Sequence, residues 1–161
     1  MRKCPRTTLL AAALPLVMLS APAAAFIFGT CTASAVGVAF GNYTPAQATP
    51  LDANGSVTVN CGSAFVFGAS PVTIALNAGA SGGTFAARRM TSGVNFLTYN
   101  LYTNGSYSAV WGDGSAGTST VSGTLNFGSQ IFTATIFGRI PALQDPVPGS
   151  YIDTITVTVN Y

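Results

Sequence analysis

The last twelve residues of the chain follow a two-residue alternation that is typical of a β-strand with one buried face. Hydroxyl and amide groups prevail on one face of this stretch. The other face is apolar or aromatic except for one aspartate and comprises Tyr151, Asp153, Ile155, Val157, Val159 and Tyr161. The stretch runs to the last residue, and no partner strand follows it. We therefore expect another segment to cover its free edge.

The N-terminus has the parts of a secretory signal peptide. Three basic residues among the first six positions precede an apolar run and a small-residue stretch that ends at Ala25. The pattern predicts cleavage between Ala25 and Phe26, and the apolar run is shorter than the roughly 20 residues that span a bilayer. We expect a signal peptide at residues 1–25 and one exported domain at residues 26–161.

The charge balance changes once the predicted signal peptide is set aside. Three of the six basic residues belong to it, so that Arg88, Arg89 and Arg139 face four aspartates in residues 26–161. A nucleic-acid surface needs a basic face with several phosphate contacts. This composition therefore predicts no nucleic-acid partner.

Residues 26–161 contain no histidine, lysine or glutamate. This composition excludes Ser–His and Cys–His pairs, imidazole metal ligands and Schiff-base chemistry. Asp113 lies in a predicted turn, and Asp52 and Asp145 lie in predicted loops, where we expect solvated or capping roles. The sequence therefore predicts a protein that is not an enzyme and has no cofactor, metal site or small-molecule substrate.

Cys31 and Cys61 are the cysteines that remain after the signal peptide, because Cys4 belongs to it. An even pair in an exported chain predicts one disulfide, and two buried free thiols are the alternative. In the chain-entropy model a disulfide closing a loop of this length stabilises the fold by about 3 to 4 kcal/mol.

The rest of the chain predicts about seven short strands separated by turns rich in glycine, proline and asparagine. The strands are expected at Val36–Phe40, Val57–Cys61, Val72–Leu76, Phe96–Tyr102, Thr118–Leu125, Ile131–Phe137 and Ser150–Tyr161. Short strands at such spacing are typical of an all-β sandwich. The predicted loop Gly62–Ser70 contains Phe65, Val66 and Phe67, which are candidates for surface contact.

Two further features have structural interpretations. We expect Arg88 or Arg89 to form an ion pair with Asp153, the charge on the core-facing side of the last strand, although a binding patch is an alternative. Trp111 is the sole tryptophan, and we interpret it as a core side chain rather than a sugar platform.

Several local motifs follow one another in a defined order along the chain. They are Cys31 with Gly37–Tyr43, Cys61 at the end of a Thr/Val strand, Arg88–Met90, Leu97–Tyr102, Trp111–Gly114, Phe137–Pro141 and Gly149–Asp153. In this order they resemble the spore coat protein U domain family, which includes subunits of archaic chaperone-usher pili. The resemblance covers nearly all of Cys31–Tyr161.

The resemblance implies an immunoglobulin-like sandwich that lacks its final strand, so that the last strand present borders an open apolar groove. In that family a periplasmic chaperone lends a strand, and the N-terminal extension of a neighbouring subunit later replaces it. Ile155, Val157, Val159 and Tyr161 are expected to line the groove. The expected protein is a structural subunit of a surface pilus or coat, exported through the periplasm, with a chaperone, an outer-membrane usher and neighbouring subunits as partners.

The N-terminus departs from this pattern. The five residues Phe26–Thr30 precede Cys31, whereas a donor strand needs roughly ten or more residues to pair along such a groove. We expect a subunit that accepts a strand but donates poorly. This favours a tip or terminal position, or a non-polymerising relative, over a main shaft subunit. At a tip we expect Phe65–Phe67 to contact surfaces in adhesion and biofilm formation.

Two alternatives remain open from the sequence. The first is a self-sufficient secreted binding or coat module, which would fold without a partner strand. The second is an outer-membrane β-barrel, since such barrels also finish on an alternating strand with a terminal aromatic. The predicted strands are shorter than the about 9 to 11 residues that span a membrane, and the paired cysteines also argue against a barrel.

Overall fold

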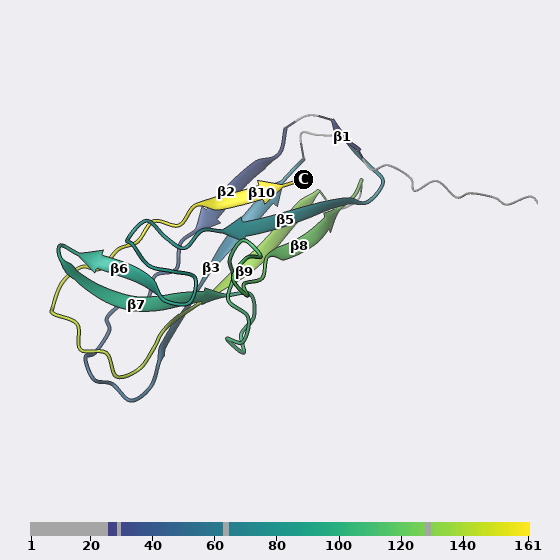
Figure 1. The fold of residues 1–161 in the computed structure, drawn as a ribbon. Coiled ribbons are helices and arrows are strands. Elements are labelled where there is room, and N and C mark those ends of the chain that lie inside the picture. The colour runs from purple at the N-terminus through teal and green to yellow at the C-terminus, as the bar shows by residue number, and fades with distance from the viewer. Residues whose placement is uncertain (1–25, 29, 63–64, 128–129) are drawn as a thin grey trace, which may run out of the picture.

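The computed structural model describes residues 26–28, 30–62, 65–127 and 130–161, and the predicted signal peptide lies outside them. These residues form ten β-strands and no helix (Figure 1). The strands are β1 (Phe26–Phe28), β2 (Thr32–Val36), β3 (Leu51–Asn60), β4 (Phe65–Phe67), β5 (Ser70–Leu76), β6 (Arg88–Ser92), β7 (Asn95–Tyr102), β8 (Val121–Leu125), β9 (Ile131–Ile140) and β10 (Val157–Asn160). No membrane-spanning helix is found in this described part of the chain.

The strands form an immunoglobulin-like sandwich of two antiparallel sheets. The larger sheet has the order β2-β3-β9-β7-β6, and the smaller one has the order β10-β5-β8. The longest pairing joins all of β3 to all of β9. A separate two-stranded ribbon joins β1 to β4 at one end of the molecule (Figure 1). Both β2 and β10 are therefore edge strands of their sheets.

One apolar core fills the space between the two sheets, because the inward positions of each strand recur with a period of two. Its buried members are Val57, Val59, Cys61, Val72, Ile74, Leu76, Met90, Leu97, Tyr99, Leu101, Trp111, Leu125, Ala134, Ile136 and Ile140. Trp111 is fully buried, and its Nε1 donates a 3.0 Å hydrogen bond to the carbonyl oxygen of Ile74. The interpretation of Trp111 as a core side chain is confirmed.

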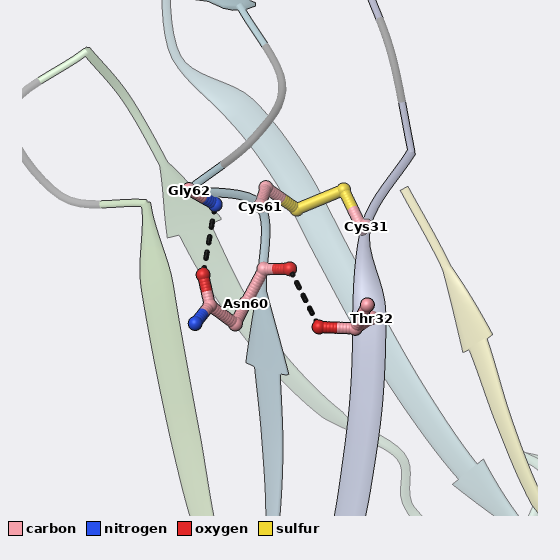
Figure 2. Close-up of a disulfide and its surroundings, with 5 residues drawn as sticks. All are labelled: Cys31, Thr32, Asn60, Cys61 and Gly62. Carbon is pink, nitrogen blue, oxygen red and sulfur yellow. Dashed lines mark hydrogen bonds between the residues drawn. A yellow bond between two sulfur atoms is a disulfide. The ribbon is translucent and has the colours of Figure 1, made fainter.

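A disulfide joins Cys31, directly before β2, to Cys61, directly after β3 (Figure 2). The two strands pair antiparallel from Thr32 opposite Asn60. The hydroxyl of Thr32 donates to the carbonyl oxygen of Asn60 at 3.2 Å, and the side-chain oxygen of Asn60 accepts from the backbone N–H of Gly62 at 2.8 Å. The disulfide therefore fixes edge strand β2 to the larger sheet at this end.

Strand boundaries differ from the predictions where pairing is decided at long range. The first strand was predicted at Val36–Phe40, but β2 spans Thr32–Val36 and ends where the predicted strand begins. The predicted loop Gly62–Ser70 contains the short strand β4, which pairs with β1. The predicted strand Ser150–Tyr161 is paired as a regular ladder only within β10, Val157–Asn160, where β5 lies beside it. The sequence also gave no indication of β6, which has one buried apolar residue, Met90.

A side-chain amide takes the place of β9 beside β7 where these two strands stop pairing. These two strands pair only over Asn100–Tyr102. Before that point the backbone N–H of Thr98 donates to Oε1 of Gln144 at 2.9 Å, and Nε2 of Gln144 donates to the carbonyl oxygen of Thr98 at 2.8 Å. The Tyr43 hydroxyl accepts from the backbone N–H of Gln144. The loop after β9 is thereby held against the sheet.

Candidate functional site

An apolar groove of about 300 Å³ separates the segment at residues 35–40 from the last segment of the chain. Its two walls come from the two edges of the sandwich, and its floor comes from β6, β7 and β9 of the larger sheet. The lining residues are Ala35, Val36, Gly37, Val38 and Phe40 on one wall, Tyr151, Ile152, Asp153, Ile155 and Val157 on the other, and Met90, Tyr99, Leu101 and Ile136 on the floor. The groove therefore lies over part of the sandwich core, between the edges of the two sheets.

The wall formed by the last segment keeps the alternation seen in the sequence. Tyr151, Asp153, Ile155, Val157 and Val159 are each half-buried, and the residues between them are exposed. Of the four residues expected to line a groove, Ile155 and Val157 do so, Val159 packs against the core, and Tyr161 is half-exposed. The inward side chains are thus covered on one side and open on the other.

The opposite wall explains why Val36, Val38 and Phe40 alternate although they do not form one strand. Val38 and Phe40 are partly buried, and both lie over the backbone of Gly138, where a Cβ atom would meet Val38 at 2.6 Å. Phe40 also packs edge-on against Tyr99, with ring centroids 5.9 Å apart. Val36, at the end of β2, is 66% exposed. This wall therefore presents apolar side chains without a neighbouring strand to cover them.

Hydrogen bonds hold the last segment from its outer side. β10 pairs with β5, and Ile152 exchanges backbone hydrogen bonds with Thr91 of β6. Between these points Thr156 is bonded to Asn77, and the carbonyl oxygen of Thr154 accepts from the N–H of Ala80. The loop after β5 thus takes the place of a strand beside residues 153–156, and the segment is fixed on the side away from the groove.

Asp153 is the charged residue of this wall, and its partners are uncharged. Oδ1 accepts hydrogen bonds from the backbone N–H groups of Ala80, Ser81 and Thr154, and Oδ2 accepts one from the hydroxyl of Tyr99 at 2.7 Å. Gly79, with φ +96°, lies against the carboxylate, and a Cβ atom there would overlap Oδ2. A glycine is required at this position because any side chain would displace the carboxylate.

Burial raises the pKa of Tyr99 strongly, and the hydrogen bond to the Asp153 carboxylate adds to this shift. The phenol is 4% exposed and lies in the floor of the groove. The folded protein therefore keeps Tyr99 as a neutral hydrogen-bond donor.

The predicted ion pair of Arg88 or Arg89 with Asp153 is wrong for the described residues. Arg88 is fully buried and donates to the carbonyl oxygens of Asn77 and Trp111 and to Oδ1 of Asn100, at distances of 2.6 to 3.2 Å. Burial lowers the pKa of Arg88, against the attraction of Tyr99 and Asp153. The Arg88 guanidinium therefore donates to these oxygens. The Asp153 carboxylate instead accepts from backbone N–H groups of the loop after β5.

The other two arginines lie outside the groove. The guanidinium of Arg89 lies 4.4 Å from the ring centroid of Phe96 on the exposed side of β6 and β7. Arg139 forms a two-pronged ion pair with Asp52, with distances of 2.7 and 2.8 Å, and stacks on Tyr107. The hydrogen bond from Arg139 is the main cause that lowers the pKa of Asp52. Asp52 belongs to strand β3, so its predicted position in a loop is wrong.

The remaining predicted site residues lie apart from the groove. Phe65, Val66 and Phe67 form β4, which pairs antiparallel with β1 so that Phe65 lies opposite Phe28, Val66 opposite Ile27 and Phe67 opposite Phe26. Their side chains lie outside the described part of the structure. Within the described residues no three histidine, cysteine or acidic side chains gather as metal ligands.

A second hollow continues the groove at the far end of the sandwich. It has a volume of about 690 Å³ and shares Val38, Phe40, Met90 and Tyr151 with the groove. The proline-rich loop at residues 146–149 forms its outer wall. The two hollows therefore adjoin at these four shared residues.

Sequence reasoning found one wall of the groove but missed the other residues that form it. The alternation in the last segment identified Ile155 and Val157, whereas Leu101 was expected only as a strand position and Met90 lay outside the predicted strands. No local signal shows that these buried residues line a groove, because the groove depends on which strands are neighbours.

A protein-family model described as the Spore Coat Protein U domain matches residues 18–158. The chain belongs to this family. No curated protein matches the chain. Fourteen chains from solved structures match the present chain. One comes from the crystal structure of the CsuC-CsuE chaperone-tip adhesion subunit pre-assembly complex from archaic chaperone-usher Csu pili of Acinetobacter baumannii.

The match to the Acinetobacter structure has a TM-score of 0.50 and 22% sequence identity. It covers 82% of the present chain and 40% of the solved chain, so this family member spans less than half the length of the chain it resembles. At this identity the likeness shows that the two share the sandwich fold.

Proposed function

We propose that the chain is an exported structural subunit of a surface pilus or coat, and that a strand from a partner completes its sandwich. The observation that carries this proposal is the groove between residues 35–40 and the last segment, with Ile155 and Val157 half-buried in its wall. β10 pairs with β5 on one side and borders the groove on the other. A strand added there gains backbone hydrogen bonds, and its alternate side chains fill the groove.

The partners proposed for this groove are a periplasmic chaperone, which occupies it first, and a neighbouring pilus subunit, which replaces the chaperone at an outer-membrane usher. Membership of the Spore Coat Protein U domain family supports this assignment. The solved chain with the same fold was crystallised in a chaperone-tip adhesion subunit complex. The proposed localisation is export through the periplasm to the cell surface.

Within such a pilus we propose a tip or terminal position. The segment before Cys31 supports this proposal, because Phe26–Phe28 already pairs with β4 as β1. A residue that pairs within its own chain is not free to extend into a neighbour. We further propose that the aromatic sequence Phe65–Phe67 contacts surfaces in adhesion and biofilm formation.

The first experiment expresses the chain for export with and without a pilus chaperone from the same organism. A stable one-to-one complex, with aggregation or degradation of the lone chain, is expected because an uncovered apolar edge is prone to association. Val157→Lys places a charge in the groove wall, and Thr158→Lys places the same charge on the exposed face of the same strand. The chaperone should be lost from the first variant and kept by the second.

A soluble chain that unfolds cooperatively without any partner would contradict the proposal. In that case the self-sufficient binding or coat module becomes the better explanation. Equal chaperone recovery with both lysine variants would likewise show that the groove is not the contact surface.

A further inference from the structure

The groove carries a single charge in an otherwise uncharged lining. Among its described lining residues Asp153 is the one ionisable acid or base apart from the tyrosines, and its neighbours along the wall are Tyr151 and Ile155. A strand that fills this groove with apolar side chains alone therefore has to cover a carboxylate. Asp153 therefore differs in charge from the other inward-facing residues of the last segment.

The surroundings of Asp153 hold the carboxylate in place without neutralising it. Its four hydrogen-bond donors are three backbone N–H groups and the neutral phenol of Tyr99. Arg88 is close enough to interact electrostatically, but its N–H groups bind Asn77, Asn100 and Trp111 instead. Three of these bonds go to Oδ1 and one goes to Oδ2, and each carboxylate oxygen has about two lone pairs, so that one lone pair of Oδ2 is left. It can accept a further donor.

Covering the groove removes water from this carboxylate. A buried charge is costly unless it is paired, and pairing with a hydrogen-bonding cation offsets the cost. A charge-assisted hydrogen bond is also about twice as strong as a neutral one. A basic side chain on the incoming strand satisfies both requirements, whereas leucine or valine at the same position satisfies neither.

We propose that the strand accepted by this groove carries a lysine or arginine at the inward position facing Asp153 and apolar residues at the other inward positions. This inference rests on the proposed function and names the chemistry of the partner. Inward side chains on a strand lie about 6.6 to 6.8 Å apart. The Asp153 contact therefore fixes the register, because a shift by two residues would place the cation beside Tyr151 or Ile155.

The test uses synthetic peptides and the exported chain, which is refolded from denaturant with each peptide present because the lone chain is expected to aggregate. A host peptide of about twelve residues has valine or leucine at inward positions and threonine at outward positions, to match the alternation of a half-buried strand. One lysine is then moved through the inward positions in turn. Binding is followed by fluorescence anisotropy of a labelled peptide and by the rise in thermal stability.

We expect one lysine position to bind about 10- to 100-fold more tightly than leucine at the same position, as for a hydrogen bond to a charged group. The other lysine positions should bind more weakly than the host peptide. The advantage should disappear in Asp153→Asn and persist in Asp113→Asn, which removes the same charge from an exposed loop outside the groove.

Two failures are distinguishable. If the apolar host peptide binds but lysine weakens binding at every inward position, the inference is overturned and strand addition stands. If no peptide binds and the chain is stable alone, the proposed function fails and the inference fails with it. Because the peptide series is measured on the unaltered protein, the result does not depend on whether Asp153→Asn folds.

Discussion

The hydroxyl of Tyr99 donates a 2.7 Å hydrogen bond to Oδ2 of Asp153, and this bond joins the floor of the groove to its C-terminal wall. Tyr99 belongs to β7 of the larger sheet, whereas Asp153 lies on the segment that leads into the smaller sheet. This hydrogen bond therefore links the two layers of the sandwich at the groove, where no strand lies between them. It fixes the wall to the floor before any partner binds.

We expect Tyr99→Phe to lower the free energy of unfolding by about 1.5 to 3 kcal/mol at neutral pH, because a buried hydrogen bond to a carboxylate is lost. Urea denaturation followed by fluorescence measures the change. Tyr161→Phe removes a half-exposed phenol at the C-terminus and is the matched control. Equal stability of the two variants would contradict the prediction.

The raised pKa of Tyr99 also predicts an alkaline effect on stability. Because the folded-state pKa lies above that of an unfolded tyrosine, about 10, the contribution is fully present below that pH and declines as pH rises above it. The unfolding free energy should therefore fall more steeply between about pH 9 and 11 in the original chain than in Tyr99→Phe. Parallel curves would show that Tyr99 is not the group responsible.

The two adjacent arginines should differ widely in their contribution to stability. Arg88→Met removes the guanidinium that donates to the carbonyl oxygens of Asn77 and Trp111 and leaves the side-chain oxygen of Asn100 with the N–H of Leu101 alone, and we expect a loss of at least about 3 kcal/mol. Arg89→Met removes a stacking contact with Phe96 on the surface and should cost about 0.5 to 1 kcal/mol. Chemical denaturation compares both variants, and a similar loss would contradict the assignment of Arg88 to the core.

Removing the disulfide with Cys31→Ser and Cys61→Ser should lower the unfolding free energy by about 3 to 4 kcal/mol. The cross-link joins residues separated by 30 positions, and most of the expected effect arises because it restricts the unfolded chain. Denaturation of the double variant and of the reduced original chain should give the same loss. A change below about 1 kcal/mol would show that β2 is held mainly by its pairing with β3.

The adhesion proposal predicts that replacing Phe65, Val66 and Phe67 with serine reduces attachment of cells that still assemble pili. Val94→Ser is the control, because Val94 is 96% exposed in the turn between β6 and β7 and belongs to a different part of the surface. Attachment is measured together with the amount of surface pili. Unchanged attachment at equal piliation would exclude Phe65–Phe67 as the contact.

The interior of the sandwich could be predicted from the sequence where the alternation is local. Val57 and Val59, and likewise Val72, Ile74 and Leu76, alternate along predicted strands and are fully buried. The Spore Coat Protein U domain family was also correctly identified from the order of short motifs. Period and β-branched composition report which side of a strand faces the core, and this requires no knowledge of its neighbours.

What could not be predicted depends on contacts between distant segments. Arg88 looks like a surface residue in sequence, and it is buried because carbonyl oxygens from Asn77 and Trp111 converge on it. Asp153 was correctly placed on the inward face but was given the wrong partner, since backbone N–H groups of a glycine-containing loop have no side-chain signature. Hydrogen bonds from the main chain are therefore the part of the site that sequence patterns do not reveal.

The Gln144 amide beside Thr98 has a consequence for how copies of this protein can associate. A peptide-like group already fills the gap next to β7, so a foreign backbone that approached this edge would have to displace two hydrogen bonds made within the chain. The edges at β2 and β10 have no comparable plug among the described residues that line the groove. A side chain therefore closes the place beside β7 to a strand from another copy, whereas the groove between residues 35–40 and the last segment stays open to one.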